Sequence, residues 1–67
     1  MAIKVILLGE GKEFELNYEK LKVGELSSLI NVRLSEYVVL RDNEILTEED
    51  YIYDGDVVKL FTVKSGG

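Results

Sequence analysis

The last two residues, Gly66 and Gly67, are the pair in this sequence whose type and position could take part in chemistry. Because glycine has no side chain, two glycines in succession can pass through a narrow enzyme channel and present a terminal carboxylate to a reactive centre. Glycines are also common where a chain end merely frays. The pair therefore indicates a reactive terminus only if the rest of the chain is built to present it.

Other chemistry is scarce in this sequence. The chain has no cysteine and no histidine, which excludes a disulfide framework, thiolate metal ligands, cysteine nucleophiles and the commonest general base. The acidic residues between positions 48 and 56 do not have the spacing of a calcium loop, and Ser27 and Ser28 have no base beside them. We therefore expect that the protein is not an enzyme and that it binds no metal or cofactor of its own.

Size and charge narrow the range of partners. The 67 residues, 46% hydrophobic and 31% charged, predict one folded domain near the lower size limit. The net charge of −5 repels phosphate backbones and anionic lipid, so we expect neither nucleic acid nor a membrane as a partner. The apolar run Ile3–Leu8 is interrupted by Lys4 and is too short for a membrane span or a signal peptide. We expect the protein in the cytoplasm.

The domain that holds the two glycines is predicted to begin with a hairpin. The run Ile3–Leu8 is β-branched or aliphatic apart from Lys4, and Gly9–Lys12 supplies the residues that a chain reversal needs. From Glu13 to Glu19 polar and apolar residues then alternate, which is typical of a half-buried strand. The glutamates of this second strand favour a place at the edge of a sheet.

One helix and further strands are predicted after the hairpin. Apolar residues recur at helical spacing over Val23–Leu34 and predict an amphipathic helix. The sequence then predicts a strand (Tyr37–Arg41), a turn (Asp42–Glu44), a short continuation (Ile45–Leu46), one helical turn (Thr47–Asp50), a tight turn (Asp54–Asp56) and a final strand (Val57–Val63). A chain of this size has no second layer to spare, so the apolar side of the helix must cover one face of the sheet. The first and last strands are aliphatic on both faces, which suits parallel neighbours at the sheet centre.

Strand alternation also predicts an apolar surface on the side of the sheet away from the helix. If Lys4, Arg41 and Lys59 face water, the same side carries Ile6, Leu8, Tyr37, Val39, Phe61 and Val63. The opposite side then carries the core, which comprises Ile3, Val5, Leu7, Phe14, Leu16, Val38, Leu40, Val58 and Leu60. Exposed apolar patches rimmed by charge often mark protein contacts. We therefore predict a partner-binding surface made of Ile6, Val39, Phe61 and Val63, continued by Lys64 and Ser65.

This order of elements resembles the ubiquitin-like β-grasp family, and within it the sulfur carriers of thiazole and molybdopterin synthesis, ThiS and MoaD. The likeness is densest at the end, where Asp54–Asp56 leads into a hydrophobic strand that reaches Phe61 and then the closing Gly66-Gly67. Chain length and the Phe-Thr-Val-Lys-Ser-Gly-Gly ending look closer to the ThiS type. The resemblance implies an α+β fold in which a mixed four-stranded sheet packs on one helix. It also implies a β-grasp domain over residues 1–63 and a flexible tail over residues 64–67.

The resemblance implies a function at the tail. An E1-like activating enzyme would use ATP to adenylate the Gly67 carboxylate, with Gly66 keeping the approach narrow. A persulfide sulfur donor would then convert the adenylate to a thiocarboxylate, and a receiving synthase would take the sulfur for cofactor biosynthesis, with the thiamine thiazole favoured and molybdopterin possible. The protein would thus be a co-substrate that binds no cofactor itself.

Two other functions fit the same ending. The adenylate could be attacked by a lysine, which would make the chain a protein modifier attached through Gly67. Alternatively, the domain could be a non-covalent β-grasp interaction module whose glycines are incidental. The fold alone does not choose among these functions, because one fold hosts many.

Overall fold

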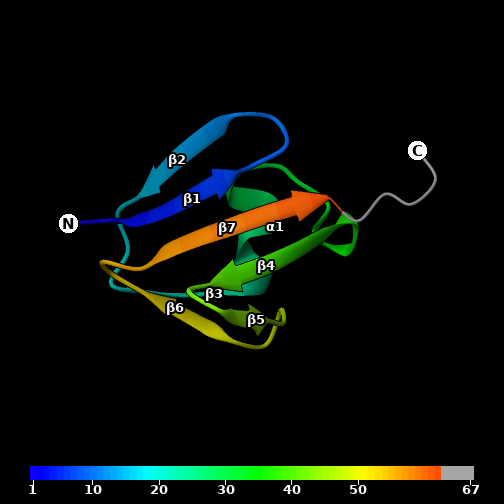
Figure 1. Ribbon diagram of the computed structural model, residues 1–67. Helices are drawn as coiled ribbons and strands as arrows, with labels where there is room; N and C mark the ends of the chain where they lie inside the picture. The colour runs from blue at the N-terminus through cyan, green and yellow to red at the C-terminus, as the bar shows by residue number, and fades with distance from the viewer. Residues whose placement is uncertain (63–67) are drawn as a thin grey trace.

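The computed structural model describes residues 1–62, in which brief helical segments lie in the chain between a first group of short strands, β1 to β3, and a second group, β4 to β7 (Figure 1). In chain order these are β1 (Ile3–Leu7), β2 (Lys12–Leu16), β3 (Lys20–Lys22), the 3-10 helix η1 (Val23–Glu25), α1 (Leu26–Leu29), the 3-10 helix η2 (Leu34–Glu36), β4 (Tyr37–Arg41), β5 (Glu44–Leu46), β6 (Tyr51–Tyr53) and β7 (Val57–Thr62). The fold is α+β. The predicted boundary between domain and tail, after residue 63, lies outside the described residues.

The main sheet has five strands in the order β2-β1-β7-β4-β5. β1 and β7 run parallel next to each other, and the other neighbours are antiparallel. The prediction that the first and last strands pair in parallel at the centre is confirmed, and so is the edge position of β2. The prediction of four strands is wrong, because β5 adds a fifth.

β5 forms because the chain reverses in two residues after β4. Arg41 pairs with Glu44 across the turn, and Asp42 takes a positive φ of 58° that lets the chain fold back. Leu46 is buried and Ile45 is 69% exposed, so the strand has one inward and one outward apolar residue. Three residues are too few for alternation to stand out in the sequence, and the segment was therefore predicted only as a continuation of the preceding strand.

A second, two-stranded sheet pairs β3 with β6. Leu21 and Ile52 lie opposite each other and are both buried. The residues before β6 were predicted to form a helical turn, but they form a hydrogen-bonded turn that leads directly into the strand. In this turn the Asp50 carboxylate accepts the Thr47 N–H at 2.7 Å and the Asp50 N–H donates to the Thr47 carbonyl at 3.1 Å.

The helical segment is shorter than the sequence predicts. α1 ends at Leu29 because Asn31 adopts a left-handed φ of 60°, and the Val32 N–H donates to the Ser27 carbonyl at 3.1 Å, as in a Schellman cap. Leu34 still reaches the core from η2, which explains why the spacing resembled a continuous helix. Within residues 1–62 no helix is long and apolar enough to cross a membrane.

The core lies between the helical segment and one face of the sheet, and α1 lies behind the sheet in Figure 1. Its buried residues are all apolar and comprise Ile3, Val5, Leu7, Leu21, Val23, Leu26, Ile30, Leu34, Val39, Leu46, Ile52, Val58 and Leu60. Phe14 and Leu16 pack against this core from the edge strand. The other face of the five-stranded sheet is not covered by any described element.

Candidate functional site

The predicted reactive residues, Gly66 and Gly67, lie outside the described residues, as do Val63, Lys64 and Ser65. The structure does describe the strand that precedes them. β7 is hydrogen-bonded on both sides, to β1 along Lys4–Leu7 and to β4 along Tyr37–Arg41, and it ends at Thr62. The segment that leads to the two glycines therefore follows the central strand of the sheet, which has a neighbouring strand on each side (Figure 1).

The uncovered side of the sheet is apolar beside the end of β7. Residues that pair across neighbouring strands point to the same side, and Leu60 points into the core, so Lys59 and Phe61 point outward. The same pairing places five apolar residues on this side, with Lys59 between Ile6 and Leu40; we call the five the outer face, and they are Ile6, Val38, Leu40, Ile45 and Phe61. Ile6 and Phe61 were both predicted on this side, and the structure confirms their orientation.

The predicted orientation of β4 is wrong. Val39 was expected on the outer side but is 5% exposed and lies opposite Leu60 in the core. Tyr37, two residues earlier, likewise packs against the core. Val38 and Leu40, which were expected in the core, belong to the outer face. Because all four residues from Tyr37 to Leu40 are apolar, the direction of β4 rested on the assumption that Arg41 faces water.

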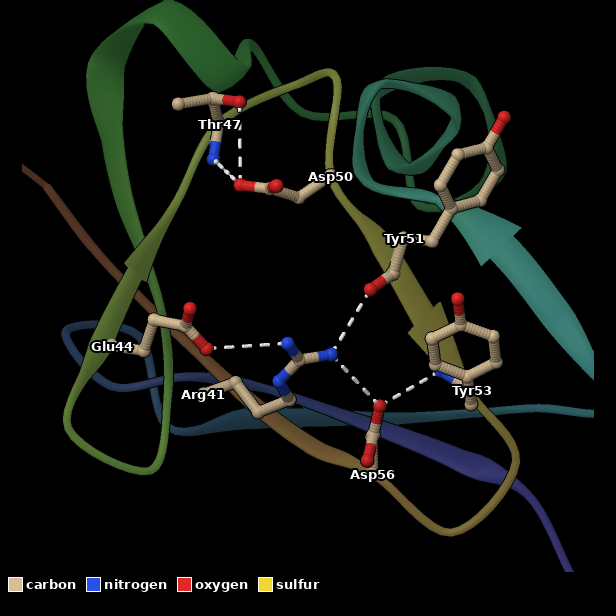
Figure 2. Close-up of polar contacts among 7 residues, drawn as sticks. All are labelled: Arg41, Glu44, Thr47, Asp50, Tyr51, Tyr53 and Asp56. Atoms are coloured by element: carbon tan, nitrogen blue, oxygen red, sulfur yellow. Dashed lines mark hydrogen bonds and ion pairs between the residues drawn. The ribbon is translucent and has the colours of Figure 1, made fainter.

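Arg41 in fact points to the inner side and is held there by three groups (Figure 2). Its Nη1 donates to the Tyr51 carbonyl at 3.0 Å and to Asp56 Oδ2 at 3.2 Å, and its Nη2 donates to Glu44 Oε1 at 3.2 Å. Asp56 Oδ2 also accepts the Tyr53 N–H at 2.8 Å. The hydrogen bond with Glu44 and, further, Asp56 raise the pKa of Arg41 against an opposing effect of desolvation.

The ion pair between Arg41 and Asp56 supplies the hydrogen bonds that a neighbouring strand would otherwise make with β6. One carbonyl and one N–H of the outer edge of β6 are satisfied by Arg41 and Asp56 instead of by another backbone. The pair joins β4, β6 and the turn before β7. It therefore connects the small sheet to the main one and closes an edge that would otherwise be open to pairing with another chain.

We expect Arg41→Gln to lower the free energy of unfolding by about 1 to 3 kcal/mol, because it leaves the partly buried Asp56 carboxylate without its charged donor. The measurement is urea denaturation, in which the midpoint should fall by about 1 M. Arg33→Gln is the matched control, since the Arg33 side chain is 83% exposed and its ion pair with Glu36 spans 3.9 Å. That control should change stability by less than about 0.5 kcal/mol. Equal effects of the two substitutions would contradict a structural role for Arg41.

A second side-chain contact lies beside the end of β7. The Tyr37 hydroxyl donates to Glu10 Oε2 at 2.8 Å, which ties the loop between β1 and β2 to the first residue of β4. Tyr37 pairs with Thr62, the last residue of β7. The hydrogen bond to Glu10 is the main cause that raises the pKa of Tyr37 above its ordinary value.

The sequence reasoning missed Val38, Leu40 and Ile45 as surface residues. The two-residue turn sets Ile45 opposite Leu40, so the direction of Ile45 follows from that of Leu40, which the sequence reasoning had placed in the core. Within residues 1–62 no cluster of His, Cys, Asp or Glu could hold a metal ion, and the same part of the chain contains no pocket. Neither the protein-family models nor the curated proteins compared with this sequence match it.

Proposed function

We propose that this chain is a sulfur carrier with a ubiquitin-like β-grasp fold of the ThiS or MoaD kind. Three features of the fold support the proposal: the N-terminal hairpin β1–β2, the helical segment that follows it, and the parallel pairing of β1 with β7. In this proposal the Gly67 carboxylate is adenylated and then converted to a thiocarboxylate. The sulfur serves cofactor biosynthesis in the cytoplasm, with the thiamine thiazole as the favoured product and molybdopterin as the other.

The observation that carries the proposal is the position of β7. This strand lies inside the sheet between β1 and β4, and it ends at Thr62, five residues before Gly67. Residues 64–67 would reach roughly 13 to 14 Å if extended. A chain with this plan can dock through its body while its last residues enter a nucleotide site. Because glycine has no side chain, two glycines at the end of the tail keep the tail thin enough for a narrow channel.

The chemistry asks little of the carrier itself. A carboxylate is a poor electrophile, so a Gly67 oxygen first attacks the α-phosphate of ATP and pyrophosphate leaves. The terminal sulfur of a persulfide then attacks the acyl carbon and AMP leaves, and a second thiol resolves the resulting acyl disulfide into thiocarboxylate and a disulfide. The activating enzyme, the persulfide protein and the receiving synthase supply these groups. The carrier contributes position.

The outer face is the surface that we propose for docking the activating enzyme. It adjoins the end of β7 through the half-buried residues Val38 and Phe61, and Ile45, farther from that end, is 69% exposed. Such uncovered apolar surface often marks a protein contact. Ile6 and Phe61 keep the partner-binding role that the sequence predicted, and Val38, Leu40 and Ile45 join them. Val39 has no such role because it is buried.

Reaction with ATP, an activating enzyme of the sulfur-carrier type and a persulfide donor should raise the mass of the intact chain by the difference of one sulfur for one oxygen. Mass spectrometry of the whole protein gives this readout, and a known sulfur carrier in the same mixture serves as the positive control. Omission of ATP should abolish the mass increase. An unchanged mass while the known carrier reacts would reject the proposal.

A further inference from the structure

The β3–β6 sheet presents a surface unlike the rest of this acidic protein. Leu21 and Ile52 point inward, so Lys20, Lys22, Tyr51 and Tyr53 all point outward from the same side. We call these four residues the basic–aromatic patch. The two tyrosines are 41% and 47% exposed. Figure 2 shows the Tyr51 ring directed away from Arg41 and toward β3.

Both lysines of the patch converge on one ring. The Lys20 Nζ lies 4.4 Å from the centroid of the Tyr51 ring, and the Lys22 Nζ lies 5.8 Å from it. A cation over a tyrosine face is attracted by the ring quadrupole, which holds the long lysine side chains in place. The two ammonium groups, however, repel each other. Placing them over one ring favours an anion that can contact both.

The described residues place little negative charge beside these two lysines. Lys22 has one carboxylate within reach, Glu49 at 3.9 Å, and the Glu49 side chain is 88% exposed. Lys20 has no carboxylate within 4.0 Å among residues 1–62. Exposed ion pairs of this kind contribute little free energy. The patch therefore has unused positive charge in a protein whose net charge is −5.

The charges around the patch favour a short anionic segment over a long polyanion as its ligand. Glu49 lies beside Lys22 at one end of the sheet, whereas strand alternation turns Glu19 and Asp54, at the other end, to the side opposite the patch. A long polyanion, such as a nucleic acid, would run its phosphates past the Glu49 carboxylate. A segment with a few carboxylates confined to the middle would meet only the lysines. Exposed tyrosines beside them suit a protein partner, because tyrosine contributes strongly at protein interfaces.

We propose that the basic–aromatic patch is a docking site for an acidic peptide segment of a protein partner. Carboxylates of the segment bind Lys20 and Lys22, and its backbone and short side chains cover Tyr51 and Tyr53. The outer edge of β3 has no neighbouring strand in the described sheet, although the Lys22 N–H already donates to Glu25 Oε1 at 3.0 Å. The site does not depend on the function proposed for the terminus.

The location of the patch lets it work together with that terminus. β6 leads through the turn at Asp54–Asp56 to the start of β7, whereas Thr62 lies at the opposite end of the same strand (Figure 1). A segment bound at the patch therefore leaves the end of β7 uncovered. The domain can hold one partner at the patch while another acts beyond Thr62.

The test is an NMR titration of the whole chain with a short synthetic peptide of alternating glutamate and threonine. The signals of residues 20–22 and 51–53, including the two tyrosine rings, should shift in a saturable way. The same peptide with glutamine for glutamate should bind at least about tenfold more weakly, because the charge-assisted contacts are gone. Raising the salt concentration should weaken the binding of the glutamate peptide.

A matched pair of double variants separates the patch from the general charge of the protein. Lys20→Gln with Lys22→Gln should weaken binding about tenfold or more, whereas Lys4→Gln with Lys59→Gln, which removes the same charge from the other sheet, should not. Equal losses in the two variants would overturn the proposal. So would tighter binding of a single-stranded oligonucleotide, or the same shifts produced by inorganic phosphate at similar affinity. Circular dichroism should show both variants folded, since these lysines lie outside the core.

Discussion

Val39→Asp is expected to destabilise the domain severely or to unfold it at 25 °C. The Val39 side chain is 5% exposed and lies opposite Leu60, so a carboxylate there would lose its water and find no donor. We expect a cost of at least about 4 kcal/mol. A domain of this size has a free energy of unfolding of about 3 to 10 kcal/mol, so this loss removes about 40% of it at the upper end of that range and all of it at the lower end. Far-ultraviolet circular dichroism and urea denaturation measure the outcome.

Val38→Asp is the matched control, because it is the same substitution one residue earlier in the same strand. Val38 lies on the outer face beside Phe61, where a carboxylate can remain in water. We expect it to cost about 1 kcal/mol, mainly from lost contact and lower strand preference. The orientation derived from the sequence predicts the reverse order of the two variants. A folded Val39→Asp with an unfolded Val38→Asp would restore that orientation and contradict the structure.

Gly66→Val is expected to lower the rate of thiocarboxylate formation at least about 100-fold, on the proposal that the tail enters a narrow nucleotide site. A branched side chain one residue before the reacting carboxylate would misplace it, and small displacements of reacting groups cost about this much. The readout is the same intact-mass assay, followed over time. The urea midpoint should not change, since position 66 lies beyond the end of β7.

Gly9→Val makes the same change at a glycine where it should be tolerated. An added Cβ at Gly9 meets no atom within 4 Å, so this variant should react at close to the normal rate. An alanine added after Gly67 should act like Gly66→Val, because it moves the carboxylate by about 3.5 Å. If both tail variants react at the normal rate, the terminal carboxylate is not the reacting group. Any mass increase would then come from a modification elsewhere in the chain.

Most of the main sheet could be predicted from the local pattern of apolar, polar and glycine residues. The hairpin needed the run Ile3–Leu8 and the glycines after it, and Gly11 has the positive φ of 66° that such a reversal requires. The parallel pairing of β1 and β7 followed from two aliphatic strands in a chain too small for a second layer. These features rest on residues close together in sequence or on the simplest packing rule, and the sequence therefore determined them.

The orientation of β4 depended on contacts that the sequence does not display. Tyr37 through Leu40 are apolar at every position, so alternation cannot distinguish the two faces. Arg41 turned inward because Glu44, Asp56 and the Tyr51 carbonyl surround its guanidinium, and these groups meet only after β5, β6 and the turn before β7 have folded. The helix ended early for a local reason, the left-handed Asn31, which the apolar spacing concealed.

The sequence by itself determined the composition, the hairpin, the paired central strands and the diglycine that motivates the proposed function. Only the tertiary structure decided which residues of β4 face outward, and hence that the outer face contains Val38 and Leu40 and not Val39. It alone also brought Lys20 and Lys22 onto the ring of Tyr51, about thirty residues away in the chain. The physical reason is the same in both cases: side-chain direction in a short strand is set by its partners across the sheet, and those partners are distant in sequence.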